Sequence, residues 1–162
     1  MRYLISALFL LFSLSSGAAP SEAELETAKK ELETYFSQLD GDWEGSIESK
    51  DYFSNDPDFV FRNKIRLRIK GDSVLVGTFR NGFWYKSGYE YKIIRHKTHA
   101  LIYAFASDKG WVESFSFTVL LKDINSLTLL WNRSVSNFMV PPSESGSRGH
   151  FQGVTVLKRL GV

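Results

Sequence analysis

Residues 58–70, DFVFRNKIRLRIK, alternate apolar and basic side chains along almost their whole length. Successive side chains of a strand point to opposite faces, so this segment has one apolar and one basic face. The apolar face holds Phe59, Phe61, Ile65, Leu67 and Ile69, and the basic face holds Arg62, Lys64, Arg66, Arg68 and Lys70. This alternation predicts a strand with one face in a hydrophobic core and the other in water.

A two-residue period of the same kind continues on both sides of this segment. Strands are predicted at 42–49, 58–70, 73–80, 83–95, 99–107, 110–122, 126–135 and 149–160. Turn sequences such as Gly71-Asp72 and Asn81-Gly82 separate most of them and favour antiparallel hairpins. The fold class predicted is therefore mainly β, an eight-stranded antiparallel up-and-down barrel over residues 42–160. An open two-layer sandwich is the alternative.

One helix is predicted before the strands, over residues 21–39. Ser21 and Glu24 have the spacing of a capping box, in which two reciprocal hydrogen bonds satisfy amides of the first turn. Apolar residues then recur at helical spacing on one face, and Gly41 is placed to end the helix. The polar face mixes Glu and Lys, whereas helices that lie on membranes are usually basic. We therefore expect this helix to dock on the domain.

Residues 1–18 have the layout of a secretory signal peptide. Arg2 supplies a positive start, residues 3–14 are almost all apolar, and small residues follow. The apolar stretch is short for a membrane span, although an uncleaved anchor helix is the alternative. We expect cleavage after Ala18, which leaves residues 19–162 as a single domain in the periplasm or outside the cell.

The composition argues against several classes of function. After removal of residues 1–18, which include Arg2, the chain has 19 Lys and Arg and 18 Asp and Glu. This nearly neutral net charge predicts no nucleic-acid partner. The chain has no cysteine, which rules out disulfides and thiolate metal sites. His96, His99 and His150 have no carboxylate at a metal-ligand spacing, and no nucleophile or phosphate-loop motif occurs. We expect no metal, no cofactor and no enzymatic activity.

The basic face of residues 58–70 allows two interpretations. It could contact anionic lipid or a protein partner in a cell envelope. Alternatively, Glu44 and Glu48 on the outer face of the preceding strand pair with it across the sheet. The second interpretation is the one we expect, because opposite charges on neighbouring strands stabilise each other.

The first predicted strand opens with Gly41-Asp42-Trp43, and the last one carries Arg159. A Gly-x-Trp opening eight meandering strands, with a basic residue on the last strand, resembles the lipocalins and the wider calycin group. Residues 88–110, GYEYKIIRHKTHALIYAFASDKG, are also similar to lipocalin-like bacterial domains of unknown function. The resemblance implies that Gly41, Trp43 and Arg159 close one end of the barrel, with the tryptophan stacked on the arginine.

Alternating strand directions sort the inward-facing residues into two ends of the barrel. Trp43 and Arg159 mark the closed end, and the long connections 50–57 and 136–148 open onto the other. Ligand-binding side chains expected at the open end are Phe59, Phe61, Tyr85, Tyr89, Phe105, Trp111, Glu113, Phe117, Arg133 and Phe151. Glu113 and Arg133 should pair if both point inward, or form a rim salt bridge in water. Aromatic residues can also fill a small barrel completely, so the existence of a cavity stays open.

Two hypotheses of function follow. The first is an exported, monomeric lipocalin-like protein that binds a small hydrophobic or amphipathic molecule in its barrel. The second is a non-enzymatic envelope interaction module that uses the basic strand face or the loops of the open end. A barrel enzyme of the isomerase or cyclase kind, which some calycins are, has no residue pattern to support it.

Overall fold

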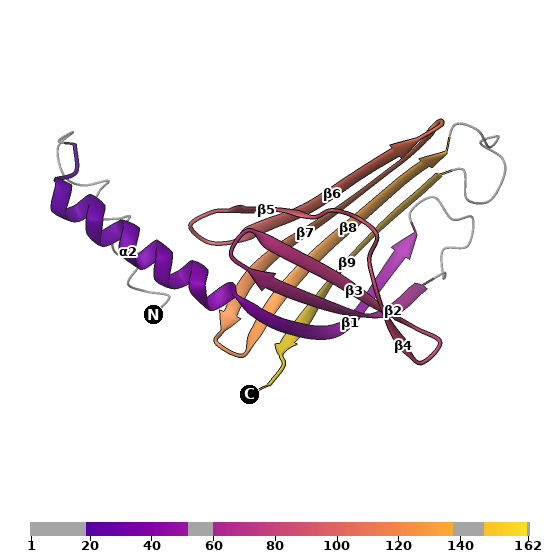
Figure 1. Cartoon of the computed structure of the whole chain (residues 1–162), viewed down its shortest axis with the longest axis horizontal. Helices are drawn as coiled ribbons and strands as arrows, with labels where there is room; N and C mark the ends of the chain where they lie inside the picture. Colours follow the sequence, from indigo (N-terminus) through magenta and orange to yellow (C-terminus); the bar gives the residue numbers. More distant parts are fainter. Residues whose placement is uncertain (1–18, 52–59, 138–147, 162) are drawn as a thin grey trace. The chain divides into compact units, whose positions relative to one another are not determined.

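The computed structural model describes residues 19–51, 60–137 and 148–161, which form one helix and nine strands (Figure 1). Helix α2 spans Glu22–Leu39. The strands are β1 (Gly41–Asp51), β2 (Val60–Lys70), β3 (Ser73–Arg80), β4 (Phe83–Lys86), β5 (Lys92–Arg95), β6 (Ala100–Asp108), β7 (Trp111–Asp123), β8 (Ser126–Asn137) and β9 (Arg148–Arg159). The chain divides into two compact units, residues 1–34 and 35–162, and the second unit holds the whole sheet.

The strands form one antiparallel sheet in the order β4-β3-β2-β1-β9-β8-β7-β6-β5. Hydrogen-bonded neighbours are consecutive in the chain except for β1 and β9, the first and last strands, which also pair. The predicted mainly β, antiparallel class with one preceding helix is confirmed. The strand count is not, because the single strand predicted at 83–95 is divided into β4 and β5.

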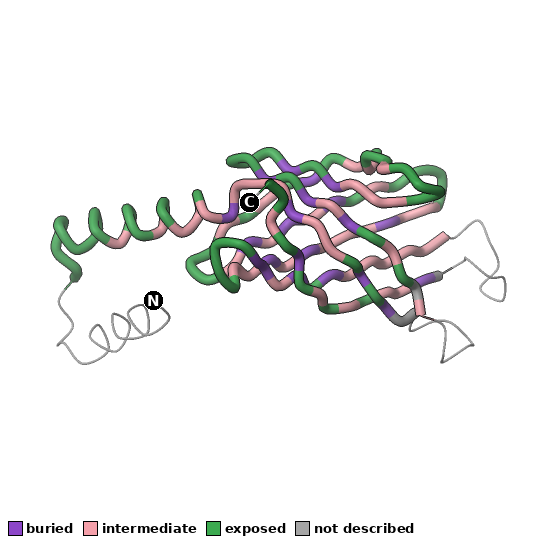
Figure 2. Tube along the Cα trace, turned by 90° about the horizontal axis from the view of Figure 1, so that it is seen from below, coloured by how far each residue is buried: buried purple, intermediate pink, exposed green. Residues whose placement is uncertain are grey.

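Residues 87–91 separate β4 from β5 and form the seam of the sheet. Here β3 meets this segment through one isolated bridge, Val74 with Tyr91. The amide of Ser87 also donates to the carbonyl of Val76 at 2.7 Å. The sheet curls far enough to bring its two ends together (Figure 2). Without a continuous ladder across the seam, the closed eight-stranded barrel is not confirmed.

The two faces of β2 follow the alternation of its sequence. Ile65, Leu67 and Ile69 are almost fully buried in the core. On the outer face, the register of β1 and β2 sets acidic residues opposite basic ones. Arg62 pairs with Glu48 at 2.7 Å, Arg66 with Glu44 at 2.5 Å and Arg68 with Asp42 at 2.7 Å. The expected cross-strand pairing is confirmed for Glu44 and Glu48.

Helix α2 begins as its sequence predicts. The Ser21 hydroxyl and amide both donate to the Glu24 carboxylate, and the Glu24 amide donates back to the Ser21 hydroxyl. These bonds lower the pKa of the Glu24 carboxyl. No helix among the described residues is long and apolar enough to cross a membrane. The predicted signal peptide, residues 1–18, lies outside the described residues.

The last turn of α2 belongs to the same unit as the sheet. Leu39 is completely buried, and Tyr35 and Phe36 pack against the core. The Tyr35 hydroxyl donates to the carbonyl of Thr98 at 2.9 Å. This turn therefore docks on the sheet, whereas docking of the preceding helical residues stays a prediction.

Candidate functional site

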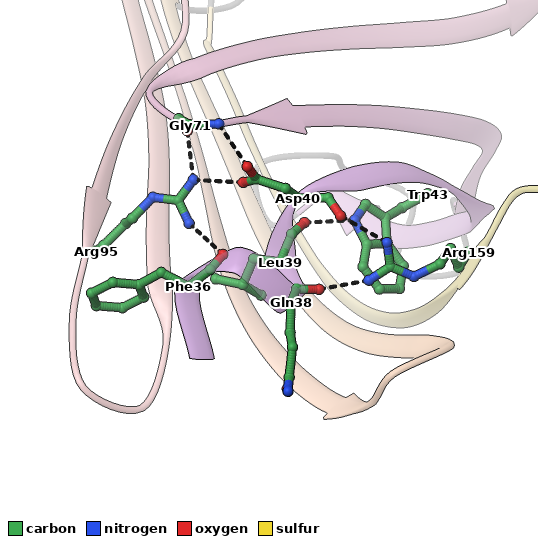
Figure 3. Close-up of polar contacts among 8 residues, drawn as sticks. All are labelled: Phe36, Gln38, Leu39, Asp40, Trp43, Gly71, Arg95 and Arg159. Carbon is green, nitrogen blue, oxygen red and sulfur yellow. Dashed lines mark hydrogen bonds and ion pairs between the residues drawn. The ribbon is translucent and has the colours of Figure 1, made fainter. Parts of the chain in front are cut away.

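The end of the sheet that was predicted to be closed holds Trp43, the aromatic residue of the Gly-x-Trp stretch (Figure 3). Trp43 is fully buried, and its indole nitrogen donates to the carbonyl of Leu39 at 2.9 Å. Arg159 is its register partner on β9, and the guanidinium carbon lies 4.1 Å from the ring centre. The stacking implied by the resemblance is thus present in the structure.

Arg159 also donates to three backbone carbonyls, two at the end of α2 and one in the turn before β8. Nη2 donates to the carbonyl of Gln38 at 2.6 Å and Nη1 to that of Asp40 at 2.7 Å (Figure 3). Nε donates to the carbonyl of Ile124 at 2.7 Å. The last carbonyls of a helix have no partner within the helix, so this side chain satisfies groups left over at the end of α2.

Gly41 has a different role from the predicted one of ending the helix. The helix ends at Leu39, and Gly41 is the first residue of β1 with a φ of +148°. A Cβ at this position would lie 2.3 Å from Nη1 of Arg159. The glycine therefore makes room for the arginine that stacks on Trp43.

A second arginine, Arg95 of β5, completes the closed end. It donates from Nη1 to the Phe36 carbonyl and from Nη2 to the Asp40 carboxylate, both at 3.0 Å. Nη2 also donates to the Gly71 carbonyl at 2.5 Å, while the Gly71 amide donates to Asp40 at 3.0 Å (Figure 3). Arg95 was not among the residues predicted for this end, because it is the last residue of β5 and no motif marks it.

The opposite end holds a cavity of about 620 Å³, within the size range of small-molecule sites. It is bordered by β1 to β4, by residues 87–91 and by β7 to β9. Aromatic side chains make up much of its wall, namely Tyr85, Tyr89, Tyr91, Phe115, Phe117, Trp131 and Phe151. Tyr89 packs against Phe115 with ring centres 4.9 Å apart.

A buried ion pair projects into this cavity. Glu113 of β7 is only 2% exposed, and Arg133 of β8 donates from Nε to its carboxylate at 2.5 Å. The Tyr89 hydroxyl donates to the other carboxylate oxygen. The guanidinium carbon of Arg133 lies 5.6 Å from the ring centre of Phe115 and 5.3 Å from that of Phe151. Glu113 and Arg133 therefore form the expected pair, with the carboxylate buried and the arginine side chain partly exposed.

The tyrosine hydroxyls of the cavity are held in their protonated form. Burial raises the pKa of Tyr89 strongly, and the hydrogen bond to the Glu113 carboxylate raises it further. Burial also raises the pKa of Tyr91, whose hydroxyl lies 3.1 Å from that of Ser87. A carboxylate disfavours a phenolate beside it, so Tyr89 remains a hydrogen-bond donor.

The ten ligand-binding residues predicted from the sequence fall into three groups. Those that line the cavity are Tyr85, Tyr89, Glu113, Phe117, Arg133 and Phe151. Phe59 lies outside the described residues, and the side chain of Phe61 is not described. Trp111 is half-buried at the start of β7 and is not among the residues that line the cavity.

The prediction for Phe105 is wrong, because it lies on the outer face of β6 and is 65% exposed. The inner face of β6 carries Ala100, Ile102 and Ala104, all buried. Residues 99–107 are apolar on both faces, so their alternation does not reveal which face is inside. Small alanines facing inward leave space for the aromatic residues of β7.

Phe115 and Trp131 line the cavity but were not among the predicted binding residues. Phe115 lies between Glu113 and Phe117, and Trp131 lies two residues before Arg133. Residues two apart share a face of a strand, so the inward positions of Glu113 and Arg133 would have identified both aromatics.

Groups of three or more acidic or histidine side chains that could hold a metal ion are not found in the described part of the chain. Comparisons with protein-family models, curated proteins and solved structures found no match.

Proposed function

We propose that this chain is a non-enzymatic binding protein that holds a small hydrophobic or amphipathic molecule in the aromatic cavity. In this proposal the curled sheet acts as a lipocalin-like barrel whose wall is completed by residues 87–91. The protein works as a monomer after export to the periplasm or the cell exterior. The export part of the proposal rests on the sequence of residues 1–18.

The observation that carries the proposal is the aromatic cavity with a buried ion pair in its wall. A cavity of about 620 Å³ is large enough to hold a small molecule. Apolar walls with a few well-placed polar groups are typical of sites that bind small molecules. Glu113 and Arg133 supply those polar groups, and the aromatic rings supply the apolar surface.

The interaction-module hypothesis has less support. Three arginines on the outer face of β2, Arg62, Arg66 and Arg68, are already paired with carboxylates of β1. Arg66 also covers the ring of Trp84, with its guanidinium carbon 4.2 Å from the ring centre. Paired charges attract anionic lipid or an acidic partner less strongly than free ones, so we favour the cavity.

Binding of the uncharged fluorescent probe N-phenyl-1-naphthylamine tests the proposal. Asn63 lines the cavity from β2, and Asn63→Trp adds an indole ring to that space. We expect the wild-type protein to bind the probe and Asn63→Trp to weaken binding by about tenfold or more, equivalent to about 1.4 kcal/mol.

Lys64→Trp is the matched control, because Lys64 is the next residue of β2 and is exposed on the outer face. This variant should bind the probe like the wild type, and circular dichroism checks that both variants fold. A wild-type protein that binds no probe, or equal weakening by the two substitutions, would contradict the proposal.

A further inference from the structure

The hairpin of β3 and β4 combines aromatic and basic side chains around a tight turn. Residues 79–86, FRNGFWYK, hold four aromatic and two basic residues. Asn81 and Gly82 form the two-residue turn, with φ values of 50° and 85°, as in the turns that best fit antiparallel hairpins. The flanking residues Arg80 and Phe83 are register partners. The turn therefore holds a cation and an aromatic ring side by side at the tip of the hairpin.

The aromatic side chains at this tip are poorly covered by the protein. Phe83 is 68% exposed and Tyr85 is 51% exposed. On the other face of the hairpin, Phe79 and Trp84 pack edge to face with their ring centres 5.4 Å apart. An exposed phenylalanine ring is solvated unfavourably by water, and tryptophan and tyrosine are enriched where proteins meet the membrane–water interface. The hairpin thus carries side chains that favour such an interface over bulk water.

The cations of the hairpin are not neutralised by carboxylates of the described residues. Arg80 and Lys86 are exposed, and neither forms a salt bridge within the described part of the chain. Lys64 of β2 is exposed and likewise unpaired there, and its Nζ lies 5.3 Å from the ring centre of Phe79. The three arginines on the outer face of β2 differ, because each is paired with a carboxylate of β1.

Acidic residues are scarce in this part of the sequence. Between residues 60 and 89, Asp72 is the single acidic residue, against seven basic ones. Asp72 lies in the turn before β3, at the end of that strand away from the hairpin tip. The tip therefore carries excess positive charge. Negatively charged lipid headgroups attract Lys and Arg side chains that lie close to the membrane surface.

We propose that the tip of the β3–β4 hairpin docks on the surface of an anionic phospholipid membrane. Phe83 enters the boundary between headgroups and acyl chains, Tyr85 lies at the level of the headgroups, and Arg80 and Lys86 bind lipid phosphates. An anionic bilayer offers an apolar layer next to a negatively charged one, so it accommodates both kinds of side chain at once. This contact goes beyond the proposed function and does not involve the paired arginines of β2.

Sedimentation of the protein with phospholipid vesicles tests the inference. The vesicles contain phosphatidylcholine, either alone or mixed with phosphatidylglycerol. We expect the wild-type protein to bind the mixed vesicles about tenfold more tightly than phosphatidylcholine alone, and added salt to weaken that binding. Equal binding to both kinds of vesicle, or binding to neither, overturns the inference. The fluorescent probe tests the proposed function separately, so either can fail without the other.

Two variants test the hairpin itself. Phe83→Ser removes the exposed ring, and the double variant Arg80→Gln with Lys86→Gln removes two unpaired cations. We expect each to weaken binding to the mixed vesicles about tenfold. Circular dichroism checks that both variants fold.

Each variant has a matched control. Phe105→Ser removes a ring of similar exposure, 65%, from the outer face of β6. Arg62→Gln with Arg68→Gln changes the net charge by the same amount as the hairpin double variant but removes cations that are already paired. Both controls should weaken binding by about twofold at most. Equal weakening by a folded variant and its control overturns the inference.

Discussion

At the scale of single residues, the closed end depends on one arginine. Arg159 stacks on Trp43 and donates to three carbonyls that come from the end of α2 and from the turn before β8. Hydrogen bonds to a charged group contribute more than neutral ones, about 1.5–3 kcal/mol each when fully formed. The side chain thereby links the last turn of α2 to Trp43 of β1 and to the turn before β8.

The first prediction concerns this residue. Arg159→Met keeps much of the side-chain volume but removes every donor, so three carbonyls lose a partner and Trp43 loses its stacked cation. We expect the free energy of unfolding, measured by urea denaturation, to fall by about 2–4 kcal/mol.

Arg68→Met serves as the control for that prediction. Arg68 makes an exposed ion pair with Asp42, and such pairs contribute about 0–1 kcal/mol. Its loss should therefore have a small effect. Equal destabilisation by the two substitutions would show that Arg159 has no special role in closing this end.

At the scale of elements, the contact of β1 with β9 depends on glycine. A Cβ at Gly153 would lie 2.1 Å from the carbonyl oxygen of Glu48, and one at Gly45 would lie 2.6 Å from a methyl carbon of Leu157. Real Cβ atoms do not approach other atoms this closely, so a side chain at either position forces the strands apart. The first and last strands can pair because both carry a glycine where they cross.

The second prediction follows from that approach. Gly153→Ala should lower the free energy of unfolding by about 2–4 kcal/mol, because overpacking against backbone cannot be relieved by a rotamer change. Gly88→Ala is the control, since a Cβ there has nothing within 4 Å. Urea denaturation compares the two variants, and a Gly153→Ala protein as stable as Gly88→Ala would refute the strand-contact argument.

Elements also differ in how well their sequences predict them. The alternation of β2 predicted its inner and outer faces correctly, because apolar and basic residues strictly alternate there. The alternation of β6 did not predict its inner and outer faces, because Leu101, Tyr103 and Phe105 on the outer face are as apolar as the residues inside. A strand that is apolar on both faces takes its orientation from its neighbours.

At the scale of the whole sheet, the seam at residues 87–91 combines weak backbone pairing with side-chain hydrogen bonds. Tyr89 reaches across to Glu113, and Tyr91 bridges to β3 through Val74. Because both tyrosines have a raised pKa in the folded state, folding holds their protons more tightly than the unfolded chain does. Their contribution to stability is complete below the ordinary tyrosine pKa of about 10 and is lost as the pH rises above it.

The third prediction is that the free energy of unfolding falls as the pH rises above about 10, and that Tyr89→Phe and Tyr91→Phe reduce this fall. Each variant lacks one ionisable hydroxyl, so its stability should depend less on pH in that range. Urea denaturation at several alkaline pH values measures the slope. Tyr103→Phe, on the outer face of β6, is the control, and an equal slope for all four proteins would contradict the prediction.

The sequence by itself determined the local features of this protein. The capping box of α2, the strand period after Gly41, the hairpin turns and the two faces of β2 depend on residues close together in the chain. The pairing of Glu113 with Arg133 could also be predicted, because a meander makes consecutive strands neighbours. The contact of Trp43 with Arg159 was implied by the resemblance to the lipocalins. Six of the predicted binding residues line the cavity, because the order and direction of the strands place them at the same end.

Only the tertiary structure decided how the two ends of the sheet meet. The bridge of Val74 to Tyr91 and the bonds of Arg95 to Asp40 and Gly71 join residues far apart in sequence. Curling of the sheet brings them together, and curling results from strand twist summed over the whole sheet. No short stretch of sequence encodes that sum, so the size of the cavity is decided only in the folded chain.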